Sequence, residues 1–195
     1  MPKAKADIKD DVGSGTITFR IEKSMLDDLR QESEQTGISV NSLVNQIIKS
    51  YIQWHNPAKK AGIGHFSKTF HAKMINSFSK DQVMKMSEDF CKHNFPDISN
   101  MLRIESSFSL FIDKFCNWLD VSGFYYRFDS TDNIDSYVIQ FDMGRNWSLY
   151  MKTTMEFTFE RYGVKNAKCE MTDNTLIIIF SKKNTDNQSI KDKID

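Results

Sequence analysis

A short stretch near the start of the chain alternates strictly between apolar and polar residues. Ile17, Phe19 and Ile21 would lie on one face of an extended segment. This period of two is typical of a β-strand with one buried face. We therefore expect a strand over residues 16–21. Its opposite, polar face carries Thr16, Thr18 and Arg20.

Two segments with helical spacing follow this stretch. Residues 22–36 are expected to form a helix that ends at Gly37, because glycine adopts the left-handed conformation that commonly stops a helix. Ser39 has a side chain suited to cap the start of a second helix. The apolar stripe of that second helix is broad. It comprises Leu43, Val44, Ile47, Ile48, Tyr51 and Ile52.

The chain is long enough for two domains. We expect a flexible arm over residues 1–15, where charges are mixed and no periodicity is visible. The strand-helix-helix unit would span residues 16–55. Residues 56–64 combine proline, glycine and lysine and predict a linker. Residues 65–181 predict an α+β domain, and residues 182–195 a disordered polar tail.

The pattern of the expected α+β domain is helix, helix, strand, strand, helix, strand, strand. This order predicts an antiparallel sheet with helices on one face. The expected helices cover residues 80–91, 100–119 and 146–162, and the expected strands cover residues 124–129, 137–143, 167–172 and 175–181.

A six-residue strand and two helices with single apolar stripes cannot form a core alone. We therefore expect two chains to pair their strands antiparallel as an obligate homodimer. A two-stranded ribbon fits the major groove of double-stranded DNA, where arginine and threonine side chains can contact base edges. The start of the second helix offers backbone N–H groups to a phosphate. The predicted phosphate contacts are Ser39, Val40 and Asn41.

These residues resemble the ribbon-helix-helix superfamily of DNA-binding proteins. The resemblance rests on residues 16–21 as the strand, on Met25, Leu26 and Leu29 in the first helix, and on the Gly37-Ile38-Ser39 junction. It covers about a fifth of the chain. It implies a dimer, or a dimer of dimers, that contacts bases through Thr16, Thr18 and Arg20 and commonly represses transcription.

The overall composition gives no support for DNA binding, so any affinity for DNA must come from local charge. Lys plus Arg and Asp plus Glu are equal at 26 each, so no overall field draws the chain toward nucleic acid. Three widely spaced cysteines suit a reducing cytosol better than a disulfide framework. No stretch reaches the length of a membrane span. We therefore expect no membrane association and a cytoplasmic location, with the protein on the nucleoid when DNA is bound.

The second domain is expected to serve ligand response or oligomerisation, as in ribbon-helix-helix regulators of the nickel-responsive type. A metal or a small-molecule effector is compatible with the sequence, although no tight pair of metal ligands is present. Aromatic residues such as Trp118 and Trp147 could line a pocket or belong to the core. The candidate metal ligands are His65, His71, Cys91, His93, Cys116 and Cys169.

Two alternatives to a ligand-responsive regulator remain. One is the antitoxin of a toxin-antitoxin pair, whose toxin-binding part is usually short and disordered. The other is a metal-responsive repressor. Because no nucleophile with an ordered base, no phosphate-binding loop and no outstanding carboxylate pair is visible, we do not expect an enzyme.

Overall fold

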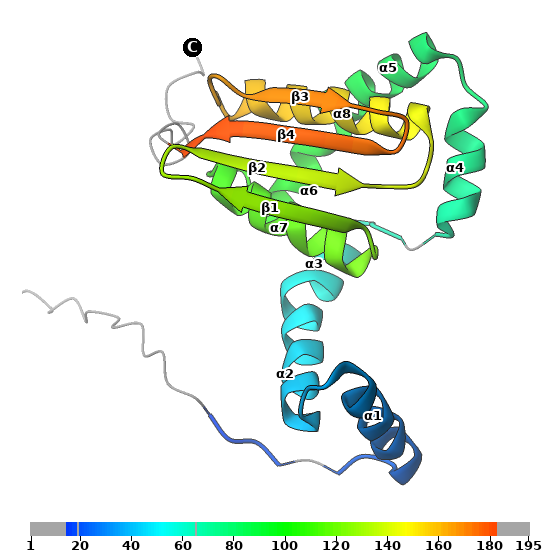
Figure 1. Ribbon diagram of the computed structural model, residues 1–195, viewed down its shortest axis with the longest axis vertical. Coiled ribbons are helices and arrows are strands. Elements are labelled where there is room, and N and C mark those ends of the chain that lie inside the picture. The colour runs from blue at the N-terminus through cyan, green and yellow to red at the C-terminus, as the bar shows by residue number, and fades with distance from the viewer. Residues whose placement is uncertain (1–14, 19, 65, 183–195) are drawn as a thin grey trace, which may run out of the picture. The chain divides into compact units, whose positions relative to one another are not determined.

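The computed structural model describes residues 15–18, 20–64 and 66–182 (Figure 1). The chain divides into two compact units, residues 1–47 and 48–195. The arm and the tail expected from the sequence lie outside the described residues, apart from Gly15 and Lys182.

The described part of the first unit contains two helices, α1 (Lys23–Thr36) and α2 (Val40–Ser50), the second of which runs on into the second unit. Gly37 ends α1 with a φ of 69°, in the left-handed region that glycine adopts without strain. Ser39 caps α2, since its Oγ accepts the backbone N–H of Ser42 at 3.1 Å. The two expected helices and the junction between them are therefore present.

The expected strand over residues 16–21 is wrong, and with it the expected ribbon-helix-helix fold class. Residues 15–18 and 20–22 have no regular secondary structure, and the first strand in the described part of the chain begins at Tyr125. A strand needs a hydrogen-bonded neighbour, and no described segment of this chain lies alongside as one. Ile17 is consequently 77% exposed, and Phe19 lies outside the described residues.

Helix α2 continues directly into a wider π-helical turn, η1 (Tyr51–His55), and then into the short helix α3 (Asn56–Lys60). The linker expected over residues 56–64 thus begins in helical structure. Trp54 and Ala58 are only 4% and 3% exposed, so this segment packs into the second unit.

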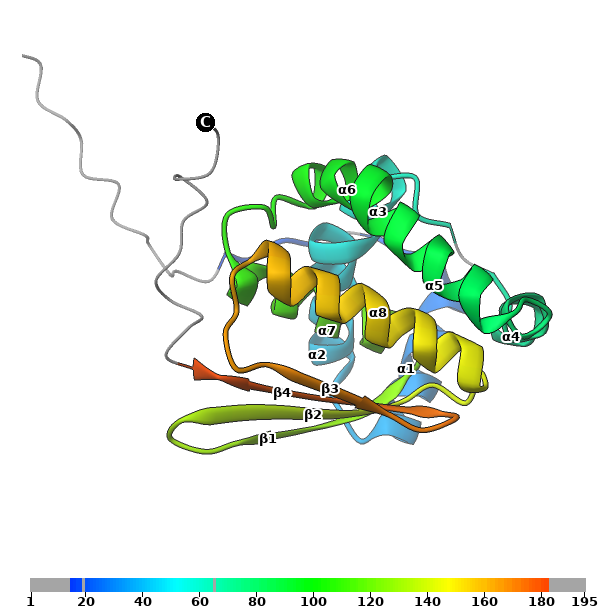
Figure 2. The ribbon, with the colours of Figure 1, turned by 90° about the horizontal axis from the view of Figure 1, so that it is seen from above.

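The second unit is an α+β domain, as the sequence predicts. Its four strands form one antiparallel sheet in the order β1-β2-β4-β3. Helices cover one face of this sheet (Figure 2). The strands are β1 (Tyr125–Ser130), β2 (Ile134–Gln140), β3 (Lys168–Met171) and β4 (Thr175–Ser181).

In the described part of this domain, η1 and α3 are followed by five longer helices and one further π-helical turn. They are α4 (Lys68–Asn76), α5 (Lys80–Asp89), η2 (Phe90–Asn94), α6 (Phe95–Leu102), α7 (Phe108–Val121) and α8 (Arg145–Arg161).

The single helix expected over residues 100–119 is interrupted. Arg103 takes a left-handed φ of 57° and ends α6, and α7 starts only after Ser107. The break lets α6 and α7 take different directions, so that both contribute to the core.

The core lies between the sheet and the helices. Every second residue of β4 is buried, namely Leu176, Ile178 and Phe180, because the strand period of two sends them all to the helical side. Phe180 meets Phe108 of α7 edge to face, with ring centroids 5.1 Å apart. Large apolar side chains thus hold the helices on the sheet. The positions of the helices relative to one another depend on contacts between the helices.

Candidate functional site

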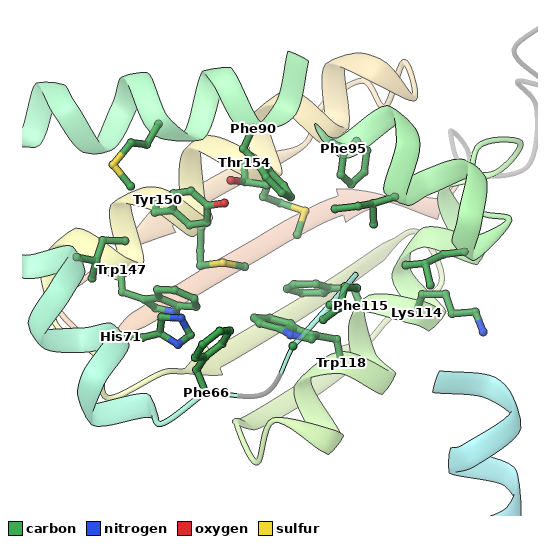
Figure 3. A pocket seen from close by; sticks show the side chains of 18 of the residues that line it. Phe66, His71, Phe90, Phe95, Lys114, Phe115, Trp118, Trp147, Tyr150 and Thr154 are labelled. Atoms are coloured by element: carbon green, nitrogen blue, oxygen red, sulfur yellow. The ribbon is translucent and has the colours of Figure 1, made fainter. Parts of the chain in front are cut away.

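A cavity of about 510 Å³ lies among the helices of the α+β domain (Figure 3). Sites for small organic ligands typically measure roughly 300–1,000 Å³, so this volume suits one such molecule. None of the described strand residues lines the cavity. Its wall combines aromatic with aliphatic and methionine side chains, and the aromatic ones include Phe90, Phe95, Phe111, Phe115, Trp118 and Trp147.

Two helices supply opposite walls of the cavity. Residues spaced three or four apart share one face of a helix. On α8 and α7 this spacing produces the lining residues Trp147, Tyr150, Met151, Thr154 and Met155, and Phe111, Lys114, Phe115 and Trp118.

An amide clamp made by Asn76 and Asn146 fixes α4 against the start of α8. Asn76 Nδ2 donates to the carbonyl oxygen of Met143 at 2.7 Å, and Asn76 Oδ1 accepts the backbone N–H of Asn146 at 3.3 Å. Asn146 Nδ2 in turn donates to the carbonyl oxygens of Ile75 and Phe78 at 3.1 and 2.8 Å. The amide clamp therefore places the lining residues of α4 beside those of α8.

The end of the cavity next to the amide clamp holds two nitrogen-bearing rings. His71 of α4 and Trp147 of α8 have ring centroids 6.4 Å apart, and Phe66 packs on His71 at 5.1 Å (Figure 3). The Trp147 Nε1–H is buried and has no hydrogen-bond acceptor among the described residues. Because buried donors are nearly always paired in folded proteins, this indole marks a place for an acceptor.

Lys114 and Trp54 belong to another part of the cavity wall. Lys114 Nζ donates to the carbonyl oxygen of Gln53 at 2.6 Å, and Figure 3 shows its side chain running away from the cavity. Trp54, the next residue, lines the cavity and has a buried Nε1–H without an acceptor in the described part of the chain. The helix that continues from α2 thus reaches the cavity wall at Trp54.

Tyr150 and Thr154 lie in the middle of the α8 wall (Figure 3). Burial raises the pKa of Tyr150 to about 12, and the neighbouring Cys91 adds to the rise. Thr154 Oγ1 is 2.8 Å from Ser87 Oγ, in a contact that joins α5 to α8. The phenol is therefore neutral at physiological pH and can only act as a hydrogen-bonding group.

The DNA contacts predicted from the sequence lie on exposed parts of the first unit. Thr16, Thr18 and Arg20 are exposed, but they do not share one face of a strand, because no strand forms. Ser39 and Asn41 are exposed at the start of α2, and Val40 is half-buried. The residues predicted to contact phosphate thus lie together at one helix end.

The first unit has little core of its own. Among its described residues only Ser33 and Leu43 are buried. Along α2 and η1 the apolar stripe is largely uncovered in the single chain. Its exposed members are Ile47, Ile48, Tyr51 and Ile52.

The candidate metal ligands do not come together. Cys91, Cys116 and Cys169 are free thiols at separate places, and His65 lies outside the described residues. No group of three or more His, Cys, Asp or Glu side chains with metal-binding geometry occurs in the part of the chain that the structure describes.

Sequence reasoning raised Trp118 and Trp147 as possible pocket residues and named His71 only as a candidate metal ligand. It did not place the three in one cavity, and it missed Trp54 and the entire helix α4. The only local signal for α4 is Ser67, whose Oγ accepts the N–H of Phe70 as an N-cap. The apolar spacing inside α4 is too short to indicate a helix by itself.

Within the described residues, no helix combines the length and the apolar composition needed to cross a bilayer. Comparison with known proteins finds no matching family model, no matching curated protein and no matching solved structure. The function therefore has to be inferred from the residues and their geometry.

Proposed function

We propose that the α+β domain is a sensor domain that binds one hydrophobic small molecule in the aromatic cavity. The observation that carries this proposal is the cavity itself, which combines a volume of about 510 Å³ with an apolar wall and two buried indole donors that find no acceptor among the described residues. The cavity is open to solvent on the side of exposed lining residues such as Phe66 and Met74, so a ligand could enter it. A mostly apolar cavity of this size is typical of a small-molecule site and favours an occupant.

A cavity-filling substitution tests ligand binding. Met74 lines the cavity and is 43% exposed, so Met74→Trp narrows the cavity with little disturbance of the core. Met101→Trp is the matched control, because Met101 is 54% exposed and does not line the cavity. We expect the neutral apolar dye Nile red to bind one per chain, and Met74→Trp alone to weaken that binding. Equal dye binding by both variants would contradict the proposal.

We further propose that the first unit binds double-stranded DNA as a homodimer, and that the sensor domain regulates it. The uncovered apolar stripe of α2 supports a second copy of the chain as its partner, since a monomer would leave these side chains in water. The Gly37-Ile38-Ser39 junction and the exposed Thr16, Thr18 and Arg20 support DNA contact. Trp54 offers the physical link, because the helix that leaves the first unit supplies a wall of the cavity.

Selection from a random library of DNA duplexes at moderate salt tests this second function. We expect the wild type to enrich a repeated short motif, and a Thr16→Ala/Thr18→Ala/Arg20→Ala variant to lose that enrichment. The exposure of these side chains makes the variant suitable, because its folding should be unaffected. Failure of the wild type to enrich any motif would remove DNA binding and leave the sensor proposal standing.

A further inference from the structure

We propose that the ligand of the cavity is a hydrophobic carboxylic acid whose carboxylate lies against Trp147 Nε1–H and His71. This inference rests on the proposed sensor function and specifies the chemical class of its ligand. It follows from the hydrogen-bonding groups of the wall, from the charges around the cavity and from the shape of the apolar part.

The hydrogen-bonding groups of the wall are mostly donors. Trp147 Nε1–H is buried without an acceptor in the described part of the chain, and the His71 ring lies beside it in Figure 3. The indole nitrogen has almost no accessible surface in this structure, so a ligand oxygen reaches it only when a neighbouring side chain such as His71 turns aside. That oxygen could then accept from the indole and from the imidazole. A carboxylate supplies two such oxygens, and its hydrogen bonds are stronger than those of a neutral acceptor.

The charges around this end favour an anion over a cation. The lining residues include no Asp and no Glu. Lys68 does not line the cavity, but its Nζ, which donates to the carbonyl oxygen of Gly123, lies 4.3 Å from the centre of the Phe124 ring that neighbours Trp147. Trp147 is also in the first turn of α8, where the helix dipole is positive. The nearby Asp173 carboxylate is exposed and already paired with Arg145 at 2.9 Å.

The rest of the cavity requires an apolar body. From the Trp147 end the wall continues over aromatic and aliphatic side chains, and the ammonium of Lys114 is turned away toward Gln53. A straight alkyl chain or an aryl-alkyl group fills such a space, whereas a sugar or a nucleotide would leave its hydroxyl groups without partners. An apolar acid therefore matches both the donor end and the apolar remainder.

The test compares three probes with the same alkyl chain, decanoate, decanol and decyltrimethylammonium, by calorimetric titration of the full chain. Trp147→Phe removes the indole N–H and keeps an aromatic ring. Trp118→Phe is the matched control, because Trp118 also lines the cavity but its indole is not a buried unpaired donor among the described residues. We expect decanoate to bind at least about tenfold more tightly than decanol, and Trp147→Phe to weaken decanoate by about tenfold or more.

The possible outcomes separate the ligand class from the sensor function. A decanoate preference that Trp147→Phe removes and Trp118→Phe retains supports the proposal. Equal binding of decanol, or preferred binding of the ammonium by the aromatic rings, overturns the carboxylate and leaves a hydrophobic sensor. If none of the three probes binds, and Met74→Trp binds Nile red as well as the wild type does, the sensor function itself is refuted.

Discussion

Gly144 is the residue on which the amide clamp between α4 and α8 depends. Its backbone has φ 86° and ψ 172°, a region that is essentially restricted to glycine. A Cβ at this position would lie 2.7 Å from Asn76 Nδ2 and 2.9 Å from Asn76 Oδ1. Gly144→Ala therefore imposes two separate costs, one on the backbone and one on the Asn76 amide.

The expected loss of stability can be worked from these two costs. The backbone strain contributes about 1–3 kcal/mol. Moving the Asn76 amide breaks its hydrogen bonds to Met143 and Asn146, at about 1 kcal/mol each. We expect Gly144→Ala to reduce the free energy of unfolding by about 3–5 kcal/mol. Gly62→Ala is the control, because Gly62 has φ 71° but open space around its Cβ, and should cost only about 1–2 kcal/mol.

Urea unfolding followed by tryptophan fluorescence measures the difference. With a slope of about 2–3 kcal/mol/M, the midpoint of Gly144→Ala should fall by more than about 1 M. The double variant Asn76→Ala/Gly144→Ala has no steric conflict. Its loss of stability should therefore be smaller than the sum of the losses in the two single variants. Additive costs, or equal midpoints for Gly144→Ala and Gly62→Ala, would refute the role of the amide clamp.

Three further predictions concern other parts of the chain. Burial raises the pKa of Tyr150 from 10.0 to about 12, so its stabilising contribution is complete below about pH 10 and is lost as pH rises to about 12. Over that range the free energy of unfolding of the wild type should fall by about 2–3 kcal/mol more than that of Tyr150→Phe. Urea unfolding at several pH values measures this difference. Burial also raises the pKa of the Cys169 thiol to about 12, so iodoacetamide should modify Cys169 much more slowly at pH 8 in the folded than in the urea-unfolded protein, and equal rates by mass spectrometry would contradict its burial. The proposed homodimer predicts that the wild type sediments as a dimer. Ile47→Glu places a charge on the exposed stripe of α2 and should then yield a monomer, whereas Gln46→Glu, at an exposed polar position, should sediment like the wild type.

Local patterns predicted those elements whose partners are close in sequence. The helix that ends at Gly37 and the hairpins of the sheet were predictable, because a capping residue or a short turn decides them. The strand over residues 16–21 was wrong, because alternation indicates only that a segment could join a sheet. No segment of the chain that the structure describes pairs with it. The break at Arg103 was not visible either, since arginine is an unusual residue for a left-handed helix end.

The sequence raised a pocket at Trp118 and Trp147 only as one of two possibilities, and the cavity itself could not be predicted. Its wall combines residues as distant as Trp54 and Met155, and each of them has an ordinary core-forming pattern on its own helix. The separation of the helices decides whether the aromatic side chains that line the cavity pack against one another or leave a space between them. Small contacts such as Ser87 with Thr154, and the amide clamp, fix that separation. Such contacts leave no periodic signal in the sequence.

The strand order β1-β2-β4-β3 also decides how the domain behaves in a crowded solution. β1 and β3 are the two edges of the sheet, and an uncovered edge can recruit a strand from another molecule. Both edges carry exposed charges, Arg127 and Asp129 on β1, and Lys168 and Glu170 on β3. A foreign strand would have to desolvate these charges in order to pair. Apolar residues at these positions would therefore lead to edge-to-edge aggregation of an otherwise correctly folded domain.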